Sequence, residues 1–226
     1  MTKGNKYNNL PIIHFNVEGE PFMAPFYLFK LNSPAFADIS LEYSGIDPEH
    51  PVDLPNENKE KFSDFLDVLL DYEPESTLDK WLNVLEVAVH YKFSGVREKA
   101  LRFLLSEAVS PLDKIQVSLE NLHEYKDHGI GACFIQGCKE LIARLEPISM
   151  EEIEILGDKL TIKLYYFRER LHRTRRPKVY LEDISPTFEK FLENREEGYT
   201  RGIQELVQDD GKCPKSVNPR KRIRCE

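Results

Sequence analysis

The stretch "FNVEGEPFMAPFYLFKLNSPAFADI", residues 15–39, changes from a strand pattern to a helix pattern within a few residues. Residues 12–17, which begin just before this stretch and overlap its start, form a short run rich in β-branched and aromatic side chains. Gly19 follows at a predicted tight turn, and Phe22 and Met23 begin the returning strand. This part of the chain therefore predicts a β-hairpin.

Two short helices and a third strand are predicted after the hairpin. Pro25 suits the first position of a helix, and Ser33-Pro34 ends that helix and starts a second one. Residues 44–51 hold Ser, Gly, two Pro and two acidic residues, which is typical of a loop. Apolar residues then alternate between prolines in residues 51–56, which indicates a short strand.

Three longer helices are predicted next, because apolar residues recur there at helical spacing. The segments are residues 59–70, 78–92 and 94–105, with Asn58 and Ser94 as predicted N-caps. The link between the second and third helices is short. It therefore predicts that these two helices are antiparallel neighbours.

A second helical region is predicted beyond residue 110. Residues 111–126 and 131–145 form an expected helix pair, and residues 158–172 form one more helix. Before this last helix, Ser149 is followed three residues later by Glu152. This spacing is the pattern of a capping box at a helix start.

The composition changes again after residue 172, where blocks of opposite charge follow one another. Residues 182–210 hold nine acidic and three basic residues, and the segments on both sides of them are basic. Apolar residues are sparse in this part of the chain. We therefore expect a charged, largely disordered tail over residues 173–226.

Overall composition excludes several classes of protein. The net charge of −8 argues against non-specific nucleic-acid binding by the whole chain. No apolar run approaches the about 18 residues of a membrane span, and the N-terminal residues lack the apolar core of a signal peptide. None of the four cysteines lies in the first 132 residues, which favours free thiols in a reducing compartment. We expect an intracellular protein, cytoplasmic or nuclear, without membrane contact.

Catalytic and metal-binding patterns are weak. His123, His128, Cys133 and Cys138 recur at intervals of five, and each such step turns a helix by about 140°, so they cannot share one face. The two cysteines are interpreted as buried thiols. The Gly-Ile-Gly at residues 129–131 follows no strand and lacks the third glycine of a dinucleotide loop. We therefore expect no metal, no cofactor and no enzymatic activity.

A basic cluster, "NPRKRIR", lies at residues 218–224. Exposed Lys and Arg side chains of this kind fit the acidic grooves of nuclear import receptors, and they also contact phosphate. The alternatives to a solvated terminal run are therefore a nuclear signal or a nucleic-acid contact. The candidate residues are Arg220, Lys221, Arg222 and Arg224.

The order of these elements resembles a BTB/POZ domain. Residues 15–39 resemble its start, and residues 50–74 look like its third strand and the following helix. Residues 81–104 are similar to the helix pair that closes the domain. Residues 110–125 and 147–157 look like the helical extension of BTB proteins common in fungi.

The resemblance implies an α+β fold in which helices surround a small sheet. The BTB/POZ-like domain would cover residues 7–107, and a mainly α-helical extension would cover residues 108–172. Such domains are non-catalytic protein–protein interaction modules that act as scaffolds, so we expect a protein partner, with a homodimer as one form.

The helix at residues 25–32 is the expected contact element. Leu28, Leu31 and Phe36 are expected in the core of such a fold, each contributing about 1.5–3 kcal/mol through burial. The other aromatic side chains of this helix cannot all point inward from one turn, so at least one is expected to be exposed. These candidate partner contacts are Phe26, Tyr27 and Phe29.

Two alternative functions remain open. A ubiquitin-ligase substrate adaptor would bind a cullin-type ligase, and such adaptors often carry a hydrophobic-x-Glu motif. Here Ser40 stands two residues before Glu42 and Asp47 stands two residues before Glu49, so the motif is absent. The other alternative is a nuclear regulator that contacts nucleic acid or an import receptor through residues 218–224.

Overall fold

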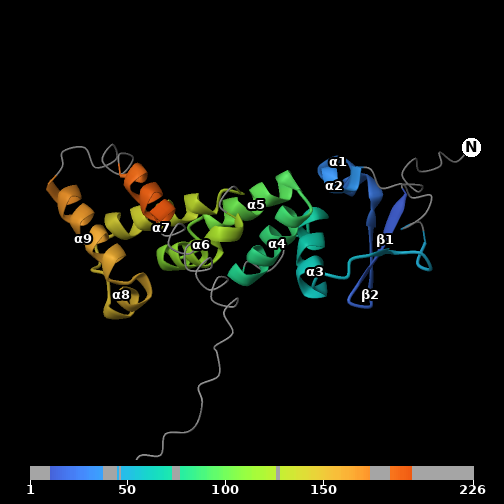
Figure 1. Ribbon diagram of the computed structural model, residues 1–226, viewed down its shortest axis with the longest axis horizontal. Helices are drawn as coiled ribbons and strands as arrows, with labels where there is room; N and C mark the ends of the chain where they lie inside the picture. The colour runs from blue at the N-terminus through green and yellow to red at the C-terminus, as the bar shows by residue number, and fades with distance from the viewer. Residues whose placement is uncertain are drawn as a thin grey trace, which may run out of the picture. The chain divides into compact units, whose positions relative to one another are not determined.

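The computed structural model describes residues 11–37, 45, 47–72, 77–125, 128–173 and 184–194. These residues form a mixed α+β fold, with a small sheet near the N-terminus followed by helices (Figure 1). The chain divides into two compact units, residues 1–175 and residues 176–226. The predicted boundary between residues 107 and 108 lies inside the first unit.

The sheet has three strands within the described residues: β1 (Ile12–Val17), β2 (Glu20–Pro25) and β3 (Val52–Asp53). The strand order is β2-β1-β3. Strand β1 is antiparallel to β2 and parallel to β3. Gly19 has a φ of 81° in the hairpin turn, a left-handed conformation that glycine adopts without strain. The predicted hairpin and third strand are confirmed.

An aromatic cluster fills the space between the sheet and the first helices. Every second residue of β1 is buried, which places Phe15 on the inner face. The Phe15 ring lies 4.8 Å from that of Phe29 and 5.2 Å from that of Phe62. Further rings join this cluster from the helical segments that follow in the chain, namely Phe36, Phe65 and Phe93.

Helices α1 (Phe26–Asn32) and α2 (Pro34–Ala37) are joined by a single buried serine. The Ser33 hydroxyl donates to the carbonyl oxygen of Tyr91 and accepts a hydrogen bond from the Ala35 N–H at 3.1 Å. Ser33 therefore ends α1 and also ties the α1–α2 corner to Tyr91. The predicted helix break at Ser33-Pro34 is confirmed.

Helices α3 (Lys59–Leu69), α4 (Leu78–His90) and α5 (Ser94–Leu104) pack against one another in sequence order. Asn58 accepts hydrogen bonds from the Glu60 and Lys61 N–H groups, which confirms it as an N-cap. The predicted Ser94 cap is wrong, because Ser94 is already the first helical residue and Phe93 precedes it. The Phe93 ring is held in the aromatic cluster, and this contact sets the start of α5.

Helices α6 (Pro111–Tyr125) and α7 (Ile130–Ala143) pack closely against each other. Gly137 permits their close approach, because a Cβ atom there would lie 2.5 Å from the Pro111 carbonyl oxygen. Lys114 of α6 is buried, and its Nζ lies 2.7 Å from Glu140 Oε1 of α7. The predicted helix pair is confirmed.

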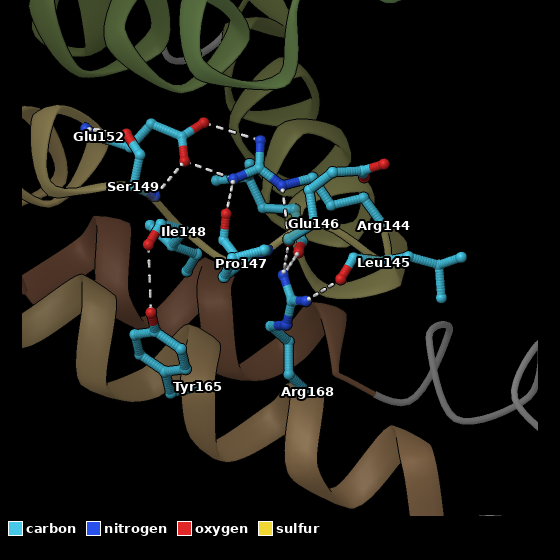
Figure 2. A network of polar contacts seen from close by, with 10 residues as sticks. Arg144, Leu145, Glu146, Pro147, Ile148, Ser149, Glu152, Tyr165 and Arg168 are labelled. Carbon is cyan, nitrogen blue, oxygen red and sulfur yellow. Dashed lines mark hydrogen bonds and ion pairs between the residues drawn. The ribbon is translucent and has the colours of Figure 1, made fainter.

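Helices α8 (Met150–Leu156) and α9 (Asp158–Arg173) are held to the end of α7 by polar contacts (Figure 2). Arg144 forms a two-pronged ion pair with Glu152, which also closes the predicted capping box with Ser149. Arg168 of α9 reaches across and donates to the Glu146 carbonyl at 2.8 Å. The capping box and the last helix of this region are thus confirmed.

The second unit contains a helix at residues 185–194. Ile184, Phe188 and Leu192 are buried and recur every four residues, which is the spacing of one helix face. This helix falls inside the tail that was expected to be largely disordered. The tail residues 174–183 and 195–226 lie outside the described residues, so the expectation for them stays a prediction.

Candidate protein-contact surface

Four large apolar side chains are exposed on β1, β2 and α1, and we call this set the N-terminal apolar surface. It consists of Ile12 (46% exposed), Met23 (66%), Tyr27 (41%) and Leu31 (78%). Single exposed apolar residues are ordinary, whereas a contiguous apolar patch marks a contact site.

The sheet contributes two members because its side chains alternate between faces. Ile13 points into the core, so its neighbour Ile12 points out. Met23 lies directly opposite His14 on the partner strand and is exposed on the same face as Ile12. The outer face of the hairpin therefore carries apolar atoms that no described element covers.

Helix α1 contributes the other two members, which lie four residues apart and so share one helix face. Tyr27 and Leu31 are exposed, whereas Phe26 and Phe29 are buried on the opposite side. The predicted partner contact at Tyr27 remains a prediction.

The structure corrects the expectation for three residues of α1. Phe26 and Phe29 cannot form a surface, because both are buried and the Phe29 ring lies 5.5 Å from that of Phe93. Leu31 was expected in the core, yet it is among the most exposed apolar side chains described. Core packing selects the two phenylalanines and turns Leu31 outward.

Ile12, Met23 and Leu31 were missed as contact candidates. The strand period of two gave a usable signal, since Ile12 alternates with buried Ile13 and Met23 alternates with Phe22. For Leu31 the signal was its spacing of four from Tyr27.

Charged side chains in this part of the chain form contacts within the protein. Lys30 extends over the Phe26 ring, with Nζ 5.9 Å from the ring centroid. Lys59 forms a 3.0 Å ion pair with Glu20, and this contact raises the pKa of the Lys59 ammonium group.

The histidines and cysteines singled out in the sequence do not form a reactive centre. His123 is exposed, while Cys133 and Cys138 are buried free thiols, as predicted. Burial raises the pKa of Cys133 to about 11 and that of Cys138 well above its usual value. Both therefore remain thiols at neutral pH, and thiols are poor nucleophiles and poor metal ligands. In the described part of the chain, no three His, Cys, Asp or Glu residues are grouped to hold a metal ion.

The acidic residues at the start of α8 are used in the fold. Glu152 accepts hydrogen bonds from Arg144, and this contact lowers the pKa of the Glu152 carboxyl group. Glu151 has a lowered pKa through a hydrogen bond from Ser149. These carboxylates stabilise a helix start, so they do not form an acid–base pair across a cleft.

The candidate nuclear-signal residues Arg220, Lys221, Arg222 and Arg224 lie outside the described residues, so their role stays a prediction. Among the helices that the structure describes, none has both the length and the apolarity needed to cross a membrane.

Comparisons with known proteins do not identify a family for this chain. No protein-family model matches the chain, and no curated protein matches its sequence.

Proposed function

We propose that the chain is a non-catalytic protein–protein interaction module of the BTB/POZ type, and that it binds a second copy of itself through the N-terminal apolar surface. The exposure of Ile12, Met23, Tyr27 and Leu31 is the observation that carries this proposal. Burial of such side chains contributes about 25 cal/mol per Å² of apolar surface removed from water.

The order of elements supports the BTB/POZ type. The hairpin β1–β2 is followed by two short helices and then by β3, which pairs in parallel with β1. The helices α3 to α5 come next and pack in sequence. This is the element order on which the sequence resemblance is based, and α6 to α9 lie in the part of the chain that resembles the helical extension.

The sheet edge favours contact through side chains over contact through strand pairing. Strand β2 is at one edge of the described sheet and carries Pro21 and Pro25, and the other edge is β3, which has only two residues. Proline has no N–H to donate and blocks the addition of a further strand. Association would therefore use the outer face of the hairpin and α1.

A stable dimer buries about 1,200 Å² or more in total, so each copy contributes about half of that area. Four side chains are too few to supply this area. In a two-fold symmetric dimer the same patch meets itself, and the polar neighbours of the four residues would then form the rim.

Light scattering coupled to size exclusion, at several protein concentrations, tests this proposal. We expect the mass to rise from that of one chain toward that of two, and Leu31→Asp to abolish the rise while circular dichroism stays unchanged. Ile162→Asp is the matched control, because Ile162 is 68% exposed on α9. A single-chain mass at every concentration, or an equal effect of both variants, would contradict self-association.

A further inference from the structure

A small cavity of about 90 Å³ lies where α4 ends and α5 begins. Its lining combines apolar residues of α4 with residues of the α4–α5 link, of α5 and of the link between α6 and α7. The lining residues are Ala88, Val89, Lys92, Phe93, Ser94, Arg97 and His128. The cavity shares no residue with the N-terminal apolar surface.

The polar lining of this cavity is basic. Lys92, Arg97 and His128 all face it, and none of the described lining residues is acidic. The Nε of Arg97 is buried and has no hydrogen-bond partner among the residues that the structure describes. Since a buried donor without an acceptor is costly, a bound acceptor at this position would stabilise the site.

Arg97 also contacts the imidazole of His128, with Nη1 at 3.4 Å from Nδ1. A guanidinium group only donates hydrogen bonds, so this contact is a hydrogen bond when Nδ1 accepts and the ring proton is on Nε2. In that tautomer His128 offers one further donor.

The first turn of α5 adds backbone donors. This helix has 11 residues, and its N-cap residue, Phe93, provides no side-chain acceptor. The N–H groups of the first turn have no partner inside the helix, and the helix dipole makes this end positive. Ser94, which lies in this turn, lines the cavity.

We propose that this cavity binds a phosphate group. Arg and Lys side chains beside a free helix N-terminus are the groups that bind phosphate in proteins. The size limits the ligand, because pockets for drug-sized molecules have about 300–1,000 Å³, whereas this one has room only for a few water molecules or one tetrahedral anion. The ligand is therefore inorganic phosphate or the phosphate end of a small phosphomonoester.

Equilibrium dialysis of the full chain with radiolabelled inorganic phosphate, at constant ionic strength, tests this assignment. We expect saturable binding of one phosphate per chain. Arg97→Gln should weaken binding about tenfold or more, because it removes a charge-assisted contact. Unlabelled O-phosphoserine distinguishes the two sources: displacement of the label indicates a site for phosphomonoesters, and retention of the label indicates a site for free phosphate alone.

Two further variants keep the test decisive. Lys92 is an exposed residue of the lining, so Lys92→Gln should leave the fold intact and weaken phosphate binding. This variant therefore tests the site even if Arg97→Gln disturbs the fold. Arg102→Gln is the matched control, because Arg102 is exposed on the same helix but does not line the cavity. The absence of saturable binding, or equal binding by wild type and folded Lys92→Gln and Arg97→Gln variants, would overturn the phosphate site.

Discussion

Lys114 carries a buried charge in the contact between α6 and α7. Its Nζ lies 2.7 and 2.8 Å from the two carboxylate oxygens of Glu140, and its side chain is fully buried. Glu140→Ala would leave this ammonium group without its counter-charge. We expect the free energy of unfolding to fall by about 3 kcal/mol, measured by urea denaturation.

A double variant separates the loss of the ion pair from a simple loss of packing. In Lys114→Met with Glu140→Ala, no buried charge remains, and an apolar side chain of similar length fills the space. We expect the double variant to be more stable than Glu140→Ala alone. If both are equally unstable, the cost comes from the shape of the site and not from the unpaired charge.

The ion pair of Glu152 should make the free energy of unfolding depend on pH. Hydrogen bonds from Arg144 lower the pKa of its carboxyl group below the usual 4.5. A lowered pKa in the folded state gives stability that is fully present above pH 4.5 and is lost as the pH falls through the folded-state pKa. We therefore expect Glu152→Gln to destabilise the protein by about 1–2 kcal/mol at neutral pH.

The difference between wild type and Glu152→Gln should shrink as the pH falls below 4.5. Urea denaturation at a series of pH values measures it. Glu154→Gln is the control, because Glu154 is exposed on the same helix, and its effect should stay within about 0.5 kcal/mol. A difference for Glu152→Gln that persists unchanged in acid would show that the charge of this carboxylate does not matter.

At the scale of the element, the closeness of α6 and α7 depends on Gly137. A Cβ atom there would lie 2.5 Å from the Pro111 carbonyl oxygen and 2.9 Å from Ile115 Cγ1. Because backbone cannot move away easily, Gly137→Ala should destabilise the protein by about 1–3 kcal/mol in thermal or urea unfolding.

Gly95→Ala is the matched control for this effect, since a Cβ atom on Gly95 meets nothing within 4 Å. In a helix, alanine is more favourable than glycine by up to about 1 kcal/mol, so this variant should be neutral or stabilised. Destabilisation by both variants would mean that Gly137 is not special.

Sequence patterns predicted the elements that have a clear polar face or a specific cap. Helix α3 has both an apolar stripe and Asn58, and α8 has its Ser149–Glu152 box. Helix α1 has only seven residues, five of them apolar, so its period cannot distinguish Phe29 from Leu31. The aromatic cluster makes that choice, and it is assembled from segments distant in the sequence.

At the scale of the whole molecule, sites that are assembled from segments distant in the sequence cannot be predicted from local sequence patterns. The strand period of two contains enough information to predict that Ile12 and Met23 are exposed. The basic cavity could not be found in this way. Lys92 and Arg97 are joined to His128 only by the packing of α5 against the region that begins α7.

Self-association would also change the stability of the whole molecule. A partner that binds only the folded chain raises the free energy of unfolding by RT ln(1 + [L]/Kd), which is about 2.7 kcal/mol at a hundredfold excess over Kd. We therefore expect the midpoint of thermal unfolding to rise with the concentration of wild-type protein. Leu31→Asp should remove this dependence, because it places a charge in the surface that would be buried between two copies.

Calorimetric scans of wild type, Leu31→Asp and Ile162→Asp over a wide range of concentration measure this dependence. Ile162 is exposed on α9, far along the chain from the N-terminal apolar surface, so Ile162→Asp should keep the wild-type slope. A midpoint independent of concentration for wild type would contradict a folded dimer. If Ile162→Asp alone removed the slope, association would instead use α9, whose exposed side also carries Tyr165 and Tyr166.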